Sequence, residues 1–296
     1  MTSALAPTAD FWDALGGGGT TDVTHELVWV SGSDAVSFTD SLLSQGIDAM
    51  APGTVRRSLL LAPNGKLRAL LWVLRGDDEV GIASDVGSAR DVLADLTRFK
   101  LRVDAVIDPE SLPLYSVIGP AAASLGEGWT RSGDEVSIRA DLGGVARRLT
   151  TKAPSGLALL SVELAEGLRI EAGEPRMGVD VDESTIPQES GLVASAVDFE
   201  KGCYLGQELV ARIDSRGHVN RRLVAVELGE GPPPVGAAVE AGGQPVGSIT
   251  SVAWSPTLGT YLGLGLIRRE ATDGCQVDVT WEGSTIGGVI RRIAND

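Results

Sequence analysis

The stretch AVDFEKGCYLGQELVARIDSRGHVNRRL occupies residues 196–223 and marks a change in the pattern of the sequence. From Arg222 onward, short apolar or alternating runs follow one another, and the glycine pair Gly242-Gly243 provides one of the turns between them. Five or six short strands within about 75 residues are typical of a small barrel or sandwich. The C-terminal part is therefore predicted to be a compact all-β unit.

Upstream of residues 196–223 the sequence mixes strand and helix patterns. An amphipathic helix is predicted at residues 88–99, with Val92 and Leu96 on its apolar side. Strands are predicted at residues 25–30, 57–61, 67–74, 80–82, 101–106, 114–118, 136–139, 157–161 and 168–170. This mixture predicts the α+β class.

Composition excludes several classes of protein. The net charge of −15 repels phosphate backbones, so a general nucleic-acid-coating role is not expected. The two cysteines, Cys203 and Cys275, are far apart and give no disulfide framework or zinc knuckle, and no metal site is predicted. The first residues lack the pattern of a signal peptide, and no apolar run reaches the ~18 residues of a membrane span. We expect a cytoplasmic protein with free thiols and no membrane contact.

The first candidate site lies within the quoted stretch. A neighbouring ammonium favours the thiolate form of a cysteine, so Lys201 beside Cys203 indicates a reactive thiol. The alternative is a turn before a helix, with the cysteine as a small buried residue. The residues singled out here are Lys201, Gly202, Cys203, Tyr204, Gly206, Gln207 and Glu208.

Two further candidates are weaker. Glu171, at the end of the strand predicted at 168–170, is a carboxylate that could accept N–H donors of a heterocycle, or be a solvated loop acid. The arginine-rich residues 212–222 could hold a polyanion, such as a glutamate tail or phosphate, or balance nearby acids. His218 has no partnered Asp or Cys nearby in sequence, and His25 lies in an apolar strand, so neither indicates a catalytic pair.

Residues 196–223 resemble the signature of YgfZ-type folate-binding proteins, relatives of the T-protein (aminomethyltransferase) of the glycine cleavage system. Three further segments resemble the T-protein superfamily: WVSGSDAVSFTDSLLSQGI, LRIEAGEPRMGVDVDESTIPQE and QPVGSITSVAWSPTLGTYLGLGLI. The resemblance implies a three-domain cloverleaf around a channel that binds tetrahydrofolate. It implies an interleaved N-terminal domain at residues 1–50 and 112–215, a ferredoxin-like α+β domain at 51–111, and a C-terminal β-barrel at 216–296.

The resemblance also assigns roles. Glu171 falls on the T-protein glutamate that contacts the pterin, and Lys201, Tyr204 and Gln207 are expected beside the folate. Cys203 would be the reactive thiol, with Lys201 favouring its thiolate. The position of the T-protein catalytic aspartate falls around Ala69 and Leu70, both apolar, which argues against glycine cleavage.

The resulting hypothesis is a tetrahydrofolate-binding accessory protein for the assembly or repair of iron–sulfur enzymes, including tRNA-modifying ones. Reduced folate and iron–sulfur client enzymes are then its expected partners. The alternative is a folate-dependent one-carbon transferase or demethylase, for which Asp198 or Glu200 could serve as base. A third alternative is a folate-binding scaffold in which Cys203 is structural.

Overall fold

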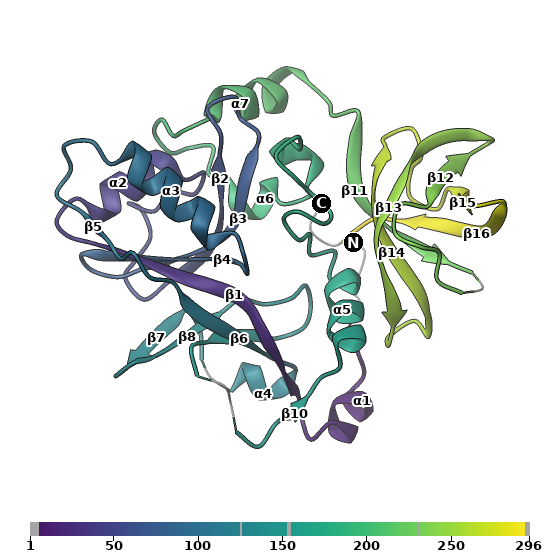
Figure 1. Ribbon diagram of the computed structural model, residues 1–296, viewed down its shortest axis with the longest axis horizontal. Helices are drawn as coiled ribbons and strands as arrows, with labels where there is room; N and C mark the ends of the chain where they lie inside the picture. Colours follow the sequence, from purple (N-terminus) through teal and green to yellow (C-terminus); the bar gives the residue numbers. More distant parts are fainter. Residues whose placement is uncertain (1–5, 125, 153–154, 230, 294–296) are drawn as a thin grey trace.

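The computed structural model describes residues 6–124, 126–152, 155–229 and 231–293. A mixed sheet and a β-barrel lie on either side of helix α5 (Val162–Glu171), as Figure 1 shows. The α+β class and the C-terminal barrel predicted from the sequence are confirmed. Within the described residues, no helix is long and apolar enough to cross a membrane.

The large sheet has ten strands, and its central strand is the long β1 (Gly19–Ser31). The short strands β5 (Val106–Ile107) and β10 (Ala158–Leu159) pair with β1, the latter in parallel. The remaining strands follow in the order β2 (Val55–Leu61), β3 (Leu67–Arg75), β4 (Glu79–Asp85), β1, β6 (Leu112–Ile118), β9 (Arg147–Thr150), β8 (Glu135–Arg139) and β7 (Trp129–Ser132). Strands from residues 51–111 and from the flanking segments thus share one sheet, and the predicted domain limits stay a prediction.

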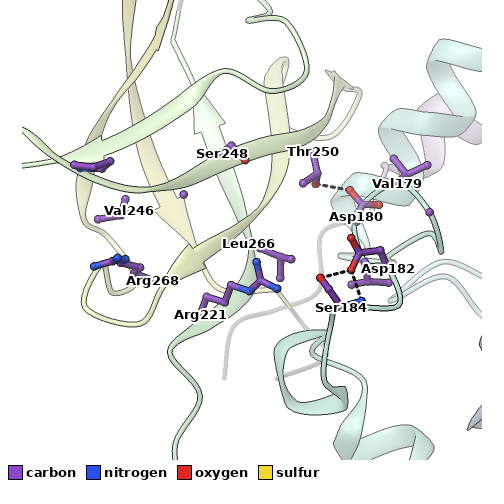
Figure 2. Close-up of a pocket in the computed structure, with 14 residues that line it drawn as sticks. Val179, Asp180, Asp182, Ser184, Arg221, Val246, Ser248, Thr250, Leu266 and Arg268 are labelled. Atoms are coloured by element: carbon purple, nitrogen blue, oxygen red, sulfur yellow. Dashed lines mark hydrogen bonds between the residues drawn. The ribbon is translucent and has the colours of Figure 1, made fainter. Parts of the chain in front are cut away.

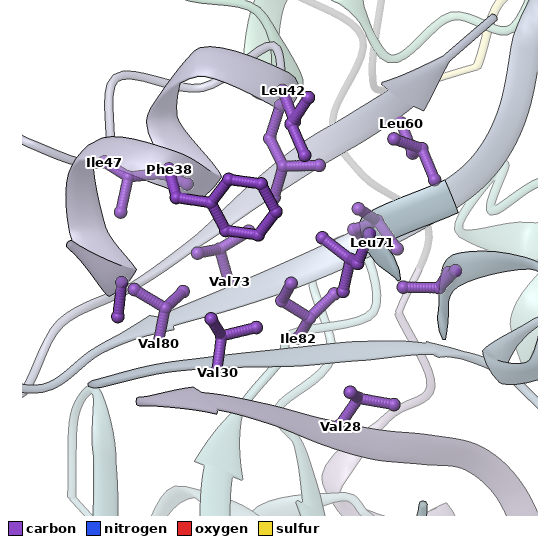
Figure 3. Close-up of a cluster of buried hydrophobic side chains, with 14 of the residues drawn as sticks. Val28, Val30, Phe38, Leu42, Ile47, Leu60, Leu71, Val73, Val80 and Ile82 are labelled. Atoms are coloured by element: carbon purple, nitrogen blue, oxygen red, sulfur yellow. The ribbon is translucent and has the colours of Figure 1, made fainter. Parts of the chain in front are cut away.

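Two helices, α2 (Ala35–Leu42) and α3 (Ala89–Phe99), cover one face of the β2–β3–β4–β1 part of the sheet. Phe38 and Leu42 of α2 meet alternate residues of the strands, such as Val73, in a buried apolar cluster (Figure 3). Alternation along β3 directs the other set of its residues to the opposite face. That opposite face borders the cavities described below.

The smaller helical elements lie in the connections. They are α1 (Ala9–Ala14), α4 (Pro120–Ala123), the 3₁₀ turn η1 (Pro187–Glu189), α6 (Val193–Ala196) and α7 (Gln207–Arg216).

The C-terminal strands form a closed barrel with its own apolar core. In order around the barrel they are β11 (Arg221–Leu228), β14 (Thr260–Arg268), β13 (Gln244–Ser255), β12 (Ala238–Ala241), β15 (Gln276–Trp281) and β16 (Ser284–Arg291). Closure leaves the barrel without free edges, which removes a site of aggregation.

The prediction of a strand at residues 168–170 is wrong, because these residues belong to helix α5. Ser161 caps the helix by accepting the N–H of Leu164. Gly167 lies within α5. The residue has to be glycine here, because a Cβ would come 2.2 Å from the carbonyl oxygen of Trp254 in β13. The glycine therefore lets the helix backbone approach the barrel closely, and does not break the helix.

Candidate functional site

Lys201 is a structural anchor. Its ammonium donates hydrogen bonds to the carbonyl oxygens of Asp40, Leu43 and Gln45 at 2.6–2.9 Å, and lies 3.2 Å from the Asp40 carboxylate. These carbonyls lie at the C-terminal end of α2, where a cation compensates for missing helix hydrogen bonds. Burial lowers the pKa of Lys201, although the Asp40 carboxylate opposes the shift. The side chain thus ties the start of the motif to α2.

Cys203 and its neighbour Gly202 are exposed. The Lys201 ammonium is bound by backbone oxygens of residues 40–45 and by the Asp40 carboxylate. In the described part of the chain no hydrogen bond joins the Lys201 ammonium to the Cys203 thiol, so activation of the thiol by Lys201 stays a prediction. The thiol lines neither the cavity of about 510 Å³ beside His25 nor the cavity of about 550 Å³ beside the barrel.

The rest of the motif forms the turn into α7. The Tyr204 ring packs into a buried cluster with Val210, and burial raises the pKa of Tyr204 to about 12. The Gln207 side-chain oxygen accepts the Tyr204 backbone N–H at 3.1 Å. Gly206 has φ 79°, and a Cβ there would lie 2.6 Å from the Ala62 carbonyl oxygen. The roles of Tyr204 and Gln207 in folate binding stay predictions, since neither residue lines a described cavity.

Glu208 is exposed in the first turn of α7, where its negative charge favours the helix N-terminus.

Glu171 is the last residue of α5 and its carboxylate faces the barrel. One oxygen accepts hydrogen bonds from the Ser255 hydroxyl and from the Thr257 N–H, the latter at 2.8 Å. The other oxygen accepts the Thr257 hydroxyl at 2.8 Å. These bonds fix the turn after β13 against α5. A pterin contact by Glu171 stays a prediction, and in this structure its carboxylate serves as an interdomain hydrogen-bond acceptor.

A cavity of about 510 Å³ opens between β1, the end of β4, β6 and helix α5. Its wall is apolar along Leu142, Leu159, Leu160 and Val162. Its polar lining includes side chains from six segments of the chain: Thr24, His25, Asp85, Ser116, Arg147, Glu166, Arg169, Glu174 and Arg176. An apolar wall with a few convergent polar groups is the usual form of a small-molecule site.

His25 and Asp85 form a polar pair in this cavity. They are directly opposite each other in the β1–β4 ladder, and His25 Nε2 lies 3.6 Å from Asp85 Oδ1. His25 Nδ1 is 2.9 Å from the Thr24 hydroxyl, which is 2.7 Å from the Ser116 hydroxyl. The other Asp85 oxygen accepts the Met177 N–H at 2.9 Å. A chain of polar groups thus runs from Ser116 to Asp85.

Burial controls the protonation of this pair. Burial raises the pKa of Asp85 to about 6, although the Met177 N–H favours the charged form. Burial, together with the positive charge of Arg147, lowers the pKa of His25 well below its ordinary value. At neutral pH the imidazole is neutral and Asp85 is a carboxylate that gains a proton readily. A group with this pKa is suited to general acid–base chemistry.

Glu174 lies beside this pair, between two arginines. Its Oε2 accepts a hydrogen bond from Arg57, and its Oε1 lies 3.5 Å from Nη2 of Arg147. Burial alone would raise the pKa of Glu174, but the two guanidinium groups outweigh it and lower the pKa. Arg57 also stacks over the Trp72 ring, 4.4 Å from the ring centroid. The deep end of the cavity is therefore charged on both sides and held rigidly.

The bases proposed from the sequence lie elsewhere. The Asp198 carboxylate accepts the Glu200 N–H at 2.9 Å, and neither residue lines a described cavity. Ala69 is buried in the cluster under α2, whereas Leu70 lines a small pocket that shares His25 with the main cavity. The apolar side chain of Leu70 thus lies beside His25, at the position where T-proteins are expected to carry a catalytic aspartate.

The arginine-rich segment borders a second cavity, of about 550 Å³, between the barrel and residues 178–184 (Figure 2). Arg221 and Arg268 are cross-strand partners there, and Arg221 also pairs with Glu189 at 2.8 Å. Across the cavity, Asp182 accepts the Ser184 hydroxyl at 2.6 Å. Binding of a polyanion by this segment stays a prediction.

Comparison with known proteins finds similarity to aminomethyltransferases. The family described as glycine cleavage T-protein C-terminal barrel domain matches residues 221–290. The aminomethyltransferase of Thermosynechococcus vestitus is 26% identical, over 84% of this chain and 76% of its own length. The aminomethyltransferase of Bacillus subtilis is 26% identical, over 87% of this chain and 82% of its own length.

The fold agrees with these matches. The crystal structure of glycine cleavage system aminomethyltransferase T from Bartonella henselae superposes with a TM-score of 0.84 at 20% identity, covering 95% of this chain and 86% of that one. The C-terminal barrel thus matches the T-protein barrel family, and the whole chain resembles aminomethyltransferases in sequence and in fold. These matches do not distinguish the YgfZ-type branch.

Proposed function

We propose that this protein binds a reduced folate in the cavity beside His25 and Asp85 and acts as a folate-dependent one-carbon transferase. The observation that carries the proposal is the titratable Asp85, which faces an amphipathic cavity with its pKa raised to about 6. The relatives are named aminomethyltransferase, and this supports a one-carbon transferase better than an accessory role.

The lining residues fit a folate. A cavity of about 510 Å³ is within the ~300–1,000 Å³ usual for small-molecule sites. The apolar wall around Leu159 and Val162 suits the aromatic part of the molecule, and the buried charged end suits the polar edge of the pterin. Arg176, partly exposed and paired with Glu166 at 2.7 Å, offers a cation for a carboxylate of the folate tail.

Bound tetrahydrofolate would supply the nitrogen that accepts the one-carbon unit. The protein's own contribution is to place and move a proton. Asp85 Oδ1 would receive the proton released from the reacting amine, and neutral His25 would keep this carboxylate oriented in the cavity. Thr24 and Ser116 continue the polar chain along the cavity wall.

A second candidate function is the YgfZ-type accessory role for iron–sulfur enzymes. The exposure of Cys203 favours it, because a solvent-accessible thiol can meet a client enzyme directly. In this role the folate cavity would regulate or support the client, and the thiol would contact it from the surface. Rescue of iron–sulfur enzyme activity in cells by the wild type, but not by Cys203→Ala at equal expression, would support this candidate; equal rescue by both would contradict it.

Binding and turnover test the main proposal. Ala165 lines the cavity from α5, so Ala165→Trp fills it, whereas Glu163→Trp places the same side chain at an exposed position of the same helix, outside the lining. Calorimetric titration with 5-formyltetrahydrofolate should show binding to the wild type and to Glu163→Trp but not to Ala165→Trp. Equal binding by all three proteins would contradict the assigned cavity.

For turnover, the purified wild type with tetrahydrofolate and an S-aminomethyl thiol should form 5,10-methylenetetrahydrofolate, releasing ammonia and the free thiol, and Asp85→Asn should lose at least ~100-fold in rate. Undiminished turnover in Asp85→Asn would contradict the role of this carboxylate.

A further inference from the structure

The second cavity, of about 550 Å³, carries charged groups that the proposed transfer reaction does not use. It lies between strands β11, β13 and β14 of the barrel and residues 178–184 (Figure 2), and it shares no lining residue with the cavity beside His25. Part of its wall is apolar, with Val179 and Leu266, and its volume is in the ~300–1,000 Å³ range of small-molecule sites. The cavity is therefore large enough for an organic ligand of its own.

Two arginines of the barrel are neighbours in this cavity without a shared counter-charge. Arg221 in β11 and Arg268 in β14 are directly opposite each other in the ladder, and both line the cavity. Like charges at such positions repel each other, so an anion beside them is stabilising. Glu189 provides one for Arg221, with Oε1 2.8 Å from Nε. Among the described residues the Arg268 guanidinium has no hydrogen bond or ion pair; Glu270 feels its charge but pairs with Arg269 at 3.4 Å.

A carboxylate lies across the cavity from these cations. Asp182 Oδ1 accepts three hydrogen bonds, from the Ser184 N–H at 2.8 Å, the Ser184 hydroxyl at 2.6 Å and the Thr185 hydroxyl at 3.1 Å. The hydrogen bonds from Ser184, together with the positive charge of Arg221, lower the pKa of Asp182. In the part of the chain that the structure describes, no hydrogen bond reaches Oδ2. Asp182 therefore has a fixed orientation and a charged oxygen left for a donor from a ligand.

The opposite charges across the cavity do not meet. In Figure 2 the Arg221 guanidinium points toward Asp182 and Ser184, whereas that of Arg268 points in another direction. Arg221 is paired with Glu189, and no ion pair joins it to Asp182 within the described residues. The cavity thus offers two separate cations on one side and one anion on the other, with open space between them.

We propose that this cavity binds a free dicarboxylic α-amino acid, such as glutamate. Its ammonium donates to Asp182 Oδ2, its α-carboxylate accepts from Arg221, and its side-chain carboxylate accepts from Arg268. Val179 and Leu266 offer apolar contact to its methylene groups. The site lies outside the cavity beside β1 and does not rest on the proposed transfer reaction.

The ammonium distinguishes a free amino acid from the glutamate tail of a folate. In such a tail the amino nitrogen belongs to a neutral amide. Both ligands offer carboxylates to the arginines, but only the free amino acid brings a positive charge to Asp182. A dicarboxylate without the ammonium places its negative charge beside this carboxylate with no compensation, which disfavours binding.

Calorimetric titration of the full chain with four ligands, at concentrations up to about 10 mM, tests the proposal. L-Glutamate should bind to the wild type. Glutarate and N-acetyl-L-glutamate lack the ammonium, and L-glutamine lacks the second carboxylate. Each of these three should bind at least ~10-fold more weakly than L-glutamate, because a charged group of the site loses its partner.

Substitutions assign the contacts. Arg268→Met removes one cation, and Arg269→Met is the matched control, because Arg269 is also exposed but does not line the cavity. Arg268→Met should bind L-glutamate at least ~10-fold more weakly and lose its preference over L-glutamine, whereas Arg269→Met should stay within ~2-fold of the wild type. Asp182→Asn should lose the preference for L-glutamate over glutarate.

Each contrary result overturns the proposal in a recognisable way. Absence of L-glutamate binding to the wild type would overturn the site and leave folate binding in the other cavity untouched. Equal binding of N-acetyl-L-glutamate would overturn the free amino acid and indicate a carboxylate tail. An equal loss in Arg268→Met and Arg269→Met would show a general effect of surface charge and also overturn the site. If Asp182→Asn does not fold, the two arginine variants decide, because both positions are exposed.

Discussion

Replacing Asp85 by asparagine should stabilise the protein at alkaline pH while abolishing its activity. Burial raises the pKa of this carboxyl from 3.8 to about 6, a difference of about two units, or roughly 3 kcal/mol at 1.36 kcal/mol per unit. The folded state therefore binds this proton more tightly than the unfolded state does. The free energy of unfolding falls as pH rises from about 4 to about 6, and the full cost is present above pH 6. Asparagine is neutral throughout, and its side-chain oxygen can still accept the Met177 N–H.

His25 acts in the opposite direction over a neighbouring pH range. Its pKa is lowered in the folded state, so below its ordinary value of 6.5 the unfolded state binds a proton that the folded state refuses. The protonation of His25 in the unfolded state therefore lowers the free energy of unfolding as the pH falls below 6.5. Because His25 Nε2 lies 3.6 Å from Asp85 Oδ1, this contribution changes in Asp85→Asn at low pH. At pH 8 the imidazole is neutral in the folded and unfolded states of both proteins, so the difference there isolates the carboxyl.

Urea unfolding at pH 4 and pH 8 measures the effect. We expect Asp85→Asn to be more stable than the wild type by up to about 3 kcal/mol at pH 8, and within about 0.5 kcal/mol of it at pH 4. Asp182→Asn is the control of opposite sign. Hydrogen bonds from Ser184 lower the pKa of Asp182, so this variant should be less stable than the wild type at pH 8. A destabilised Asp85→Asn at pH 8, or the same difference at both pH values, would refute the reasoning.

Three further substitutions test the remaining assignments by urea unfolding. Glu171→Gln should lose about 2 kcal/mol, because the carboxylate accepts three hydrogen bonds that hold the barrel turn; an unchanged midpoint would argue against that role. Lys201→Met should lose about 3 kcal/mol, since three carbonyl oxygens of residues 40–45 lose a charged donor, and a loss below 1 kcal/mol would show that water replaces it. Cys203→Ser should stay within about 0.5 kcal/mol of the wild type, because the side chain is exposed; a larger loss would indicate a structural thiol.

Much of the fold follows from local patterns in the sequence. The alternation of apolar residues in 67–74 and the helical spacing in 88–99 correctly predict β3 and α3. The prediction fails at α5, where Gly167 and the short apolar run after it are typical of a broken helix and a strand. The glycine is needed because the barrel backbone lies against it at Trp254, and a contact of that kind is not visible in a local pattern.

Less of the candidate site than of the fold could be predicted from the sequence. His25 and Asp85 are 60 positions apart and become partners only through the register of β1 and β4. Arg147 belongs to β9, which the sequence pattern did not reveal, and Glu174 follows Glu171 in a loop rich in charged residues. The Lys201–Glu208 motif is recognisable as a signature, but its side chains mainly build a turn and anchor α2.

The crystal structure of the protein with 5-formyltetrahydrofolate tests the central claim most directly. The account predicts that the ligand occupies the cavity between β1 and α5, with its ring system beside Asp85, Arg147 and Glu174. A folate bound in the second cavity, between the barrel and residues 178–184, or on the surface near Cys203, would contradict it.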